Sequence, residues 1–405
     1  MRILQLFNQY RSRFNGEQEV VGQIERLLAD DGHTVETWQR SSQDIEATLA
    51  GKATAFSKMV WSREAAGAMS AKIDAFAPDV IHVHNLYPLF SPSVLKSAAD
   101  RGVPVVMSLH NQALTCPKAD HLRNGSICEK CFGGREWNCV THNCRGSIVE
   151  SIGYAVRSAA ASRGGWFRDR VDRFLAMTEF ARERLIRAGY PTEKLAVLPN
   201  SVRLPEQTAT PTEGEYLAFA GRLSEEKGLR VLVAAAAQCP DVPIHLAGDG
   251  PLAAELREHA GRNVVFRGRL SHDEMDEFYA RARAVVLPST CFEMCPLTIL
   301  EAMAGGLPVI ASQTGGLGEL VDHDSTGLLV TRGEAAPLAS AMQRLWTDDA
   351  AAASMGQAGR IKAEAEYTER VFLDRLLGHY DEVIGSDRPS AHEPTATSGR
   401  ALVAV

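Results

Sequence analysis

The stretch that most constrains the fold is residues 287–312, which read LPSTCFEMCPLTILEAMAGGLPVIAS. It begins at the end of an apolar run, and a polar loop follows. Pro296 stands where a helix would start, because the first turn tolerates a missing N–H, and the glycines at 305–306 would end that helix. A second apolar run at 308–311 predicts another strand. This strand–loop–helix–strand unit is typical of a parallel α/β sheet, whose ligand site lies beyond the carboxyl ends of the strands.

Two carboxylates, Glu293 and Glu301, lie on the loop and in the helix of this unit. A carboxylate can accept hydrogen bonds from two neighbouring hydroxyl groups, as sugars and riboses present them. The helix start between them offers free backbone N–H groups and a positive dipole end, which suit a phosphate. The residues at this helix start are Cys295, Pro296, Leu297 and Thr298. The unit would thus bind a sugar, a diphosphate and a ribose in a row, unless both glutamates are solvated surface charges.

The spacing of the two glutamates, E-x7-E, followed by EAMAGGLPVIAS, resembles the donor-site signature of glycosyltransferase family 4. Members of this family are retaining enzymes of the GT-B architecture. The resemblance implies an α/β fold with two Rossmann-like parallel-sheet domains that face a cleft. It also implies that Glu293 holds hydroxyl groups of the donor sugar and that Glu301 holds the ribose of the nucleotide.

A second motif, GRLSEEKG at residues 221–228, follows the apolar run at 216–220. It places Arg222 and Lys227 on a loop that leads into a helix, where two cations can clamp a diphosphate. The motif closely matches the G-R-L-x-x-x-K-G of the family. The resemblance implies that the two cations and the helix start stabilise the leaving diphosphate, so that no metal is needed for the chemistry.

Other positions are assigned largely through the resemblance. Gly16 begins a helical pattern after a polar loop, a geometry in which glycine lets the backbone approach a phosphate. Relatives usually carry two glycines there, and Asn15 replaces the first. Arg269 and Leu270 stand where relatives hold the base with backbone groups. His110 follows an apolar run and would contact the donor sugar or the acceptor.

The composition limits the class of protein. The chain has 405 residues, 45% of them apolar, and a net charge of −7, which argues against general nucleic-acid binding. It holds no apolar run long enough to span a bilayer. The N-terminus lacks the pattern of a signal peptide, so we expect a cytoplasmic protein.

The motifs and changes in composition divide the chain into parts. The expected parts are an N-terminal acceptor-binding Rossmann-like domain at 1–203, a cysteine-containing insert at 111–146, a linker at 204–215, a nucleotide-sugar-binding Rossmann-like domain at 216–366, a helix at 367–385 that crosses back to the first domain, and a disordered tail at 386–405. The helix crossing is implied by the resemblance, and the tail is predicted from its Pro, Ser and Thr content.

The insert holds five of the eight cysteines. The spacing C-x11-C-x2-C-x12-C is typical of a tetrahedral thiolate site for structural zinc. Its cysteines are Cys116, Cys128, Cys131 and Cys144. Cys139 and His142 are further candidates for the fourth ligand, while disulfides, free thiols and an iron–sulfur cluster are alternatives. A similar LHN…CP…C-x2-C…C segment occurs in a subset of family relatives linked to exopolysaccharide synthesis.

Residues 147–173 read as a helical segment that is unusually basic. Arginines alternate with Trp166 and Phe167, a composition that suits an anionic membrane surface. Nucleic-acid contact and a solvated face with two core aromatics are the alternatives. The chain would then associate with a membrane from the cytoplasmic side.

Taken together, the resemblance implies a retaining glycosyltransferase of polysaccharide biosynthesis. It would move a sugar from a nucleoside diphosphate sugar to a hydroxyl acceptor, which could be a glycan, a lipid-linked molecule or a small molecule. An epimerase or a glucan phosphorylase of GT-B fold is an alternative, but epimerases need further acid–base residues and phosphorylases need a cofactor lysine, and the sequence shows no motif for either. A non-enzymatic scaffold that binds a partner through the cysteine insert is a third alternative.

Overall fold

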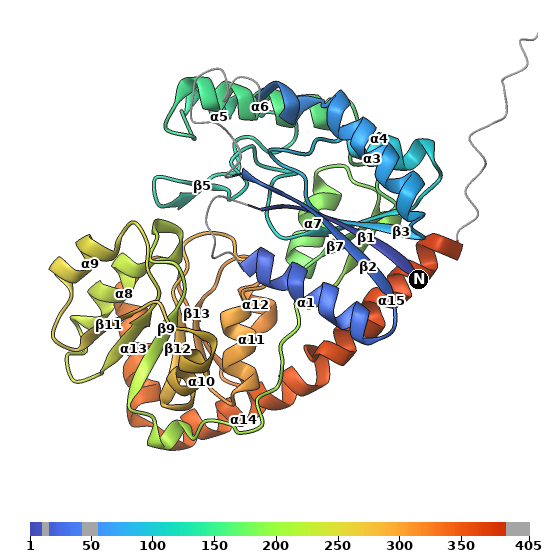
Figure 1. The fold of residues 1–405 in the computed structure, drawn as a ribbon. Coiled ribbons are helices and arrows are strands. Elements are labelled where there is room, and N and C mark those ends of the chain that lie inside the picture. The colour runs from blue at the N-terminus through green and yellow to red at the C-terminus, as the bar shows by residue number, and fades with distance from the viewer. Residues whose placement is uncertain (10–15, 43–55, 386–405) are drawn as a thin grey trace, which may run out of the picture.

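The computed structural model describes residues 1–9, 16–42 and 56–385. The polar loop with Asn15 and the tail at 386–405 lie outside the described residues. The described chain forms two parallel six-stranded sheets, each covered by helices, and a short antiparallel hairpin (Figure 1). The predicted fold class, two Rossmann-like parallel-sheet domains, is confirmed.

The first sheet has the strand order β2-β1-β3-β4-β7-β8, and all neighbouring strands are parallel. Its strands are β1 (Arg2–Gln9), β2 (Thr34–Ser41), β3 (Val80–Asn85), β4 (Val105–Leu109), β7 (Arg173–Ala176) and β8 (Leu195–Val197). Strands such as β3 and β4 are apolar and buried along their length, as expected for a parallel sheet with helices on both faces.

The helices of the first domain connect these strands. They are α1 (Gly16–Asp30), α3 (Arg63–Phe76), α4 (Ser93–Asp100), α5 (Asn138–Thr141), α6 (Ile148–Arg163) and α7 (Glu179–Arg187). On α1, Val20, Val21, Ile24, Leu27 and Leu28 share the buried face that their spacing predicts. The insert between β4 and α6 carries the hairpin β5 (Leu122–Arg123) and β6 (Ser126–Ile127), and then α5.

The second sheet has the order β11-β10-β9-β12-β13-β14, again with parallel neighbours. Its strands are β9 (Tyr216–Ala220), β10 (Ile244–Ala247), β11 (Val264–Gly268), β12 (Ala282–Leu287), β13 (Val309–Ser312) and β14 (Gly327–Val330). Its helices are α8 (Leu229–Ala236), α9 (Ala253–His259), α10 (His272–Ala280), α11 (Leu297–Ala304), α12 (Leu317–Leu320), α13 (Ala335–Thr347) and α14 (Asp349–Glu366).

The strand order of the second sheet reverses between β9 and β12, which are neighbours although they are far apart in the chain. In open parallel sheets the ligand crevice lies at the carboxyl ends of the two strands on either side of such a reversal. The loops that follow β9 and β12 contain the GRLSEEKG motif and Glu293. The topology therefore brings together the two motifs on which the sequence interpretation rests.

The last helix, α15 (Glu369–Gly385), packs on the first domain (Figure 1). Its residues Phe372, Leu376 and Tyr380 lie in one apolar cluster with Ile3 of β1. The chain crosses between the domains twice, near Val202 and near Tyr367. These two crossings lie side by side, since the Val202 N–H donates to the Tyr367 carbonyl at 2.8 Å. The helix thus covers one face of the first sheet after leaving the second domain.

The helix predicted for the basic segment at 147–173 is too long. The basic segment is helical only in α6, and a turn follows at residues 164–170. Phe167 is buried in the core and Trp166 packs against it, so these aromatic side chains do not form a membrane-facing surface.

No helix in the described ranges has the length and apolar character needed to cross a membrane.

Candidate functional site

The loops after β9 and β12 touch each other closely at Gly228. This residue has φ +68°, and a Cβ there would stand 1.9 Å from the Pro288 carbonyl oxygen. The Thr290 N–H also donates to the Glu226 carbonyl at 2.8 Å. A glycine is therefore required where the two loops meet, and this contact fixes the position of the side chains that the loops carry.

Lys227 and Glu293 form an ion pair across the two loops. The Lys227 Nζ lies 2.7 Å from Glu293 Oε1, and the Ser289 hydroxyl donates to the same oxygen at 2.5 Å. Burial opposes the charge on Lys227, but the neighbouring Glu293 carboxylate outweighs it, and the pKa of Lys227 is raised above its usual value. The pair thus places a fixed cation and a fixed carboxylate at the reversal point of the second sheet.

The backbone of Glu293 is held from a third loop. The Gly316 N–H donates to the Glu293 carbonyl at 2.8 Å. Gly315 has φ +58°, and a Cβ there would stand 2.5 Å from the same carbonyl oxygen. The glycine pair between β13 and α12 therefore allows the close approach that orients Glu293.

Arg222 does not contact Glu293 through any hydrogen bond or ion pair found among the described residues. Its guanidinium pairs with Glu226 on the same loop, with Nη2 and Oε1 2.5 Å apart, and its side chain is 60% exposed. The predicted clamp role of Arg222 is not tested by this arrangement and stays a prediction.

The start of α11 lies beside these loops. Pro296 occupies the N-cap position with an extended backbone, and a proline side chain cannot cap the first-turn N–H groups. The Thr298 hydroxyl donates to the carbonyl of Ala220, the last residue of β9, at 3.3 Å. Across the domain boundary, a Cβ on Gly16 would be 4.0 Å from the Leu297 side chain. The starts of α1 and α11 therefore face each other.

Glu301 lies one turn further along α11 and bonds to Tyr279 of α10. The Tyr279 hydroxyl donates to Glu301 Oε2 at 2.8 Å. Burial raises the pKa of the Glu301 carboxyl above its ordinary value. Nearby, Arg269 Nε lies 3.7 Å from Asp249 Oδ2, which links the loops after β10 and β11 where the base was predicted to bind.

The first domain contributes a chain of histidines behind His110. His110 Nε2 is 3.0 Å from His84 Nδ1, and His84 Nε2 is 2.8 Å from Gln5 Oε1. Because the Gln5 amide nitrogen donates to Thr37, its oxygen accepts from His84, and His84 in turn accepts from His110. Burial lowers the pKa of His110 to about 4. His110 is therefore a neutral imidazole whose Nε2 carries the proton bound to His84. Its Nδ1 lone pair takes no part in the hydrogen bonds to His84 and Gln5.

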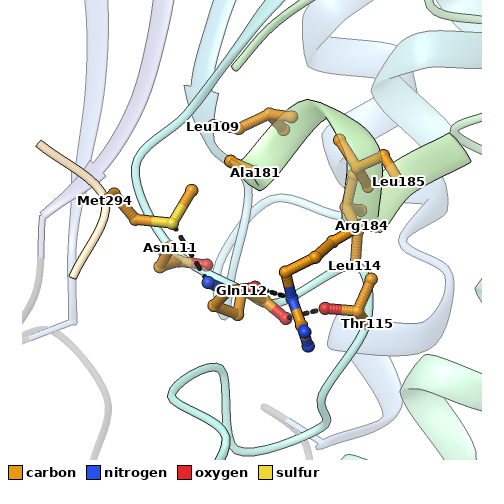
Figure 2. A pocket seen from close by; sticks show the side chains of 9 residues that line it. All are labelled: Leu109, Asn111, Gln112, Leu114, Thr115, Ala181, Arg184, Leu185 and Met294. Carbon is orange, nitrogen blue, oxygen red and sulfur yellow. Dashed lines mark hydrogen bonds between the residues drawn. The ribbon is translucent and has the colours of Figure 1, made fainter. Parts of the chain in front are cut away.

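The two domains meet next to Glu293. The Gln112 amide donates to Met294 Sδ at 3.1 Å, and the Arg184 guanidinium lies 4.6 Å from the ring centroid of Phe292. Figure 2 shows Gln112 between Met294 and Arg184 at this small hollow. Buried Arg184 also pairs with Glu129 of the insert. One arginine thus ties the insert to the loop that carries Glu293.

The five cysteines of the insert come from segments that fold against each other. Cys131, Cys139 and Cys144 share a small apolar cluster with Ala155 of α6, and all five are free thiols. Burial raises the pKa of Cys131 to about 12, and the other four thiols add to this shift. Within the described ranges, no group of three or more His, Cys, Asp or Glu side chains is arranged to hold a metal ion. The zinc site stays a prediction.

The structure brings together most of the predicted donor residues, namely Lys227, Glu293, the α11 start and Glu301. It also shows partners that the sequence interpretation missed. Ser289 lies four residues before Glu293, yet a loop serine carries no signal of its own. Arg184 reads as an ordinary helix arginine in the sequence, and only its tertiary contacts reveal its place between the domains.

Each half of the chain matches a family model of glycosyltransferases. Residues 14–205 match the family described as Glycosyltransferase Family 4, and residues 214–348 match the family described as Glycosyl transferases group 1. The two matches together cover the first domain from residue 14 and the second domain up to residue 348.

Curated relatives match over part of their length. A 2-deoxystreptamine glucosyltransferase of Streptomyces kanamyceticus is 31% identical over 196 residues, which are 46% of this chain and 50% of the relative. A D-inositol 3-phosphate glycosyltransferase of Arthrobacter sp. (strain FB24) is 32% identical over 46% of this chain and 48% of its own. A sulfoquinovosyl transferase of Arabidopsis thaliana is 33% identical over 148 residues, which are 36% of this chain and 29% of the relative. The chain therefore spans about half or less of the length of these relatives.

Solved structures resemble the whole described chain. HepE of Anabaena in complex with UDP has a TM-score of 0.67 at 19% identity, with 94% of this chain and 100% of that chain covered. Sucrose-phosphate synthase of Thermosynechococcus elongatus has a TM-score of 0.70 at 20% identity, with 94% and 98% covered. These likenesses establish the shared two-domain fold.

Proposed function

Because this chain belongs to the glycosyltransferases of family 4, which have the GT-B architecture, we propose that it transfers a sugar from a nucleoside diphosphate sugar to a hydroxyl group with retention of configuration. The relatives named above are glycosyltransferases, and HepE has been solved with UDP and with UDP-glucose. Those ligands belong to the relatives and support the donor class proposed for this chain.

The observation that carries the proposal is the ion pair between Lys227 and Glu293 beside the start of α11. An ammonium group has three donors, so Lys227 can bind a phosphate oxygen while it keeps its bond to Glu293. The α11 start adds backbone N–H groups and a dipole that favour the same charge. Arg222 would exchange its partner Glu226 for the diphosphate when the donor binds.

The nucleoside would lie along α11 and the neighbouring loops. Glu301 would accept hydrogen bonds from the ribose hydroxyls through the carboxylate oxygen that Tyr279 leaves free. Arg269 and Leu270, at the end of β11, would hold the base through backbone groups. This orientation points the donor sugar toward Glu293 and the first domain.

The acceptor would approach from the first domain, on the same face of the sugar as the departing diphosphate. Glu293 would hold sugar hydroxyls, and the neutral His110 would accept a hydrogen bond from a hydroxyl through Nδ1. The bond between the anomeric carbon and the diphosphate oxygen breaks while the acceptor oxygen attacks, and the acceptor proton passes to the departing diphosphate. Lys227, Arg222 and the α11 start stabilise the charge that develops there.

The test is a panel of nucleoside diphosphate sugars offered with sugar and polyol acceptors, monitored by proton NMR. We expect one donor to release its nucleoside diphosphate and to yield a glycoside with the donor's anomeric configuration. An epimerised donor, a phosphorylated sugar or an inverted glycoside would contradict the proposal, as would failure of every donor to bind.

A further inference from the structure

Exposed apolar side chains gather in one short part of the first domain. Within the described ranges, eight large apolar residues are exposed, and five of them fall between residues 137 and 156. These five are Trp137, Ile148, Val149, Ile152 and Val156. Single exposed apolar residues are common on soluble proteins, whereas a cluster of this kind marks a surface that binds a partner or a membrane.

Four of these residues lie on one face of α6. At 3.6 residues per turn, Ile148, Val149, Ile152 and Val156 fall within an arc of about 100°. The exposed Arg163, at the last turn of the helix, falls within the same arc. The exposed face of α6 is therefore an apolar stripe that ends in a cation, and we call these five residues the α6 stripe.

The opposite side of α6 fixes the helix in this orientation. Ser151, Ala155 and Ala161 are buried against the domain, and buried Arg157 donates to the Pro117 carbonyl at 2.9 Å. Arg157 also lies 4.2 Å from the centroid of the Tyr87 ring. The helix cannot rotate to bury its apolar stripe without breaking these contacts, so the stripe stays on the surface.

The charge around the stripe is opposite to that of the rest of the chain. Residues 123–163 contain six Lys and Arg and three Asp and Glu, a net charge of +3, while the whole chain carries −7 and the remainder therefore −10. Of the acidic residues, Glu136 is buried and Glu129 pairs with Arg184. The exposed charge beside the stripe is thus mainly positive, and it includes Lys130 and Arg135.

We propose that the α6 stripe docks the protein on the surface of an anionic lipid bilayer. An amphipathic helix that lies flat in the interface buries its apolar face among the acyl chains, and neighbouring cations bind the anionic headgroups. A second copy of the chain fits less well, because a symmetric contact would set the positive segment against itself. The first domain, which carries His110, would then lie next to the membrane.

This proposal does not depend on the catalytic one, because it is tested by binding to vesicles without any substrate. The full chain is sedimented with vesicles of phosphatidylcholine, and with vesicles of equal parts phosphatidylcholine and phosphatidylglycerol. We expect binding to the anionic vesicles that is on the order of 10-fold stronger than to the neutral ones and that weakens with salt.

The discriminating variant combines Val149→Ser with Ile152→Ser, which are 71% and 39% exposed and can be changed without disturbing the core. Its vesicle partition should fall on the order of 10-fold or more, because both side chains lose their transfer into the bilayer. The matched control is Ile361→Ser on α14, 59% exposed and outside the stripe, which should bind like the unmodified chain.

Three results would overturn the proposal. One is absence of binding of the unmodified chain to anionic vesicles, and another is equal binding to both kinds of vesicle. The third is an equal loss of vesicle binding in the stripe variant and in the Ile361→Ser control. A change from dimer to monomer in the stripe variant, measured by light scattering without an effect on vesicle binding, would assign the stripe to self-association instead.

Discussion

Replacing Lys227 with methionine should destabilise the protein as well as inactivate it. Glu293 is 8% exposed and shares Oε1 between Lys227 and Ser289. Lys227→Met keeps most of the side-chain volume but removes the ammonium group, so the carboxylate loses its only ionic partner found among the described residues. A carboxylate left buried without its counter-charge costs more free energy than the pair itself contributes.

The size of the effect follows from the burial of the pair. Removing one partner of a fully buried pair costs about 3–5 kcal/mol, and the Lys227 side chain remains 22% exposed, so we expect about 2–3 kcal/mol. With about 2–4 °C per kcal/mol for domains of this size, the melting temperature should fall by roughly 5–10 °C. Adding Glu293→Gln to the Lys227→Met variant removes the uncompensated charge and should restore most of the lost unfolding free energy.

The assay is urea unfolding of the unmodified chain, the two single variants and the double variant. A coupling free energy of about 1–3 kcal/mol is expected from this cycle. Turnover should stay low in the double variant, on the order of 10²–10³-fold below the unmodified chain, because the cation that stabilises the leaving group is still missing. Additive stability losses in the double variant, with no coupling, would refute the reasoning.

The remaining predictions address the ribose, the histidines and the insert. Glu301→Gln should weaken nucleoside diphosphate binding roughly 10- to 150-fold by calorimetry, and unchanged affinity in this variant would exclude the ribose role. Because burial raises the pKa of Glu301, binding to the unmodified chain should also weaken as the pH falls through that raised value. Burial lowers the pKa of His82 to about 3 and of His110 to about 4, so below about pH 6.5 the unfolded chain binds protons that the folded chain does not. The unfolding free energy should therefore fall as the pH drops below about 6.5, and the contribution of these two groups should approach about 2.7 kcal/mol per pH unit near pH 5. A pH-independent unfolding free energy between about pH 6.5 and 5 would contradict the buried neutral state. Protein purified without chelator should contain about one zinc per chain and lose it in Cys128→Ser with Cys131→Ser, whereas metal-free protein with five titratable insert thiols would end the zinc prediction.

The sequence was sufficient where local order decides the structure. The helix predicted between Pro296 and the glycines at 305–306 is α11, because the proline, the apolar helix and the glycine pair all favour the same boundaries. The strand before the GRLSEEKG motif has the predicted bounds for the same reason. Such segments need no tertiary information to be placed.

The sequence was insufficient where distant contacts decide. Lys227 and Glu293 are 66 residues apart, and their pairing depends on the strand order of the sheet. Phe167 follows a basic helix, but a turn directs it into the core, so a pattern that resembled a membrane surface was partly a core pattern. The apolar stripe of α6 can be identified only once its buried face is known.

The most direct test of the central claim is calorimetric titration of nucleoside diphosphates into three proteins. These are the unmodified chain, the Lys227→Met and Glu293→Gln double variant, and Arg230→Met, which removes an exposed cation of α8 that pairs with Glu225 and Glu255. We predict that the unmodified chain and Arg230→Met bind one nucleoside diphosphate with the same affinity, and that the double variant binds it roughly 10- to 150-fold more weakly. Equal affinity in all three proteins, or equal loss in both variants, would contradict a diphosphate site at Lys227.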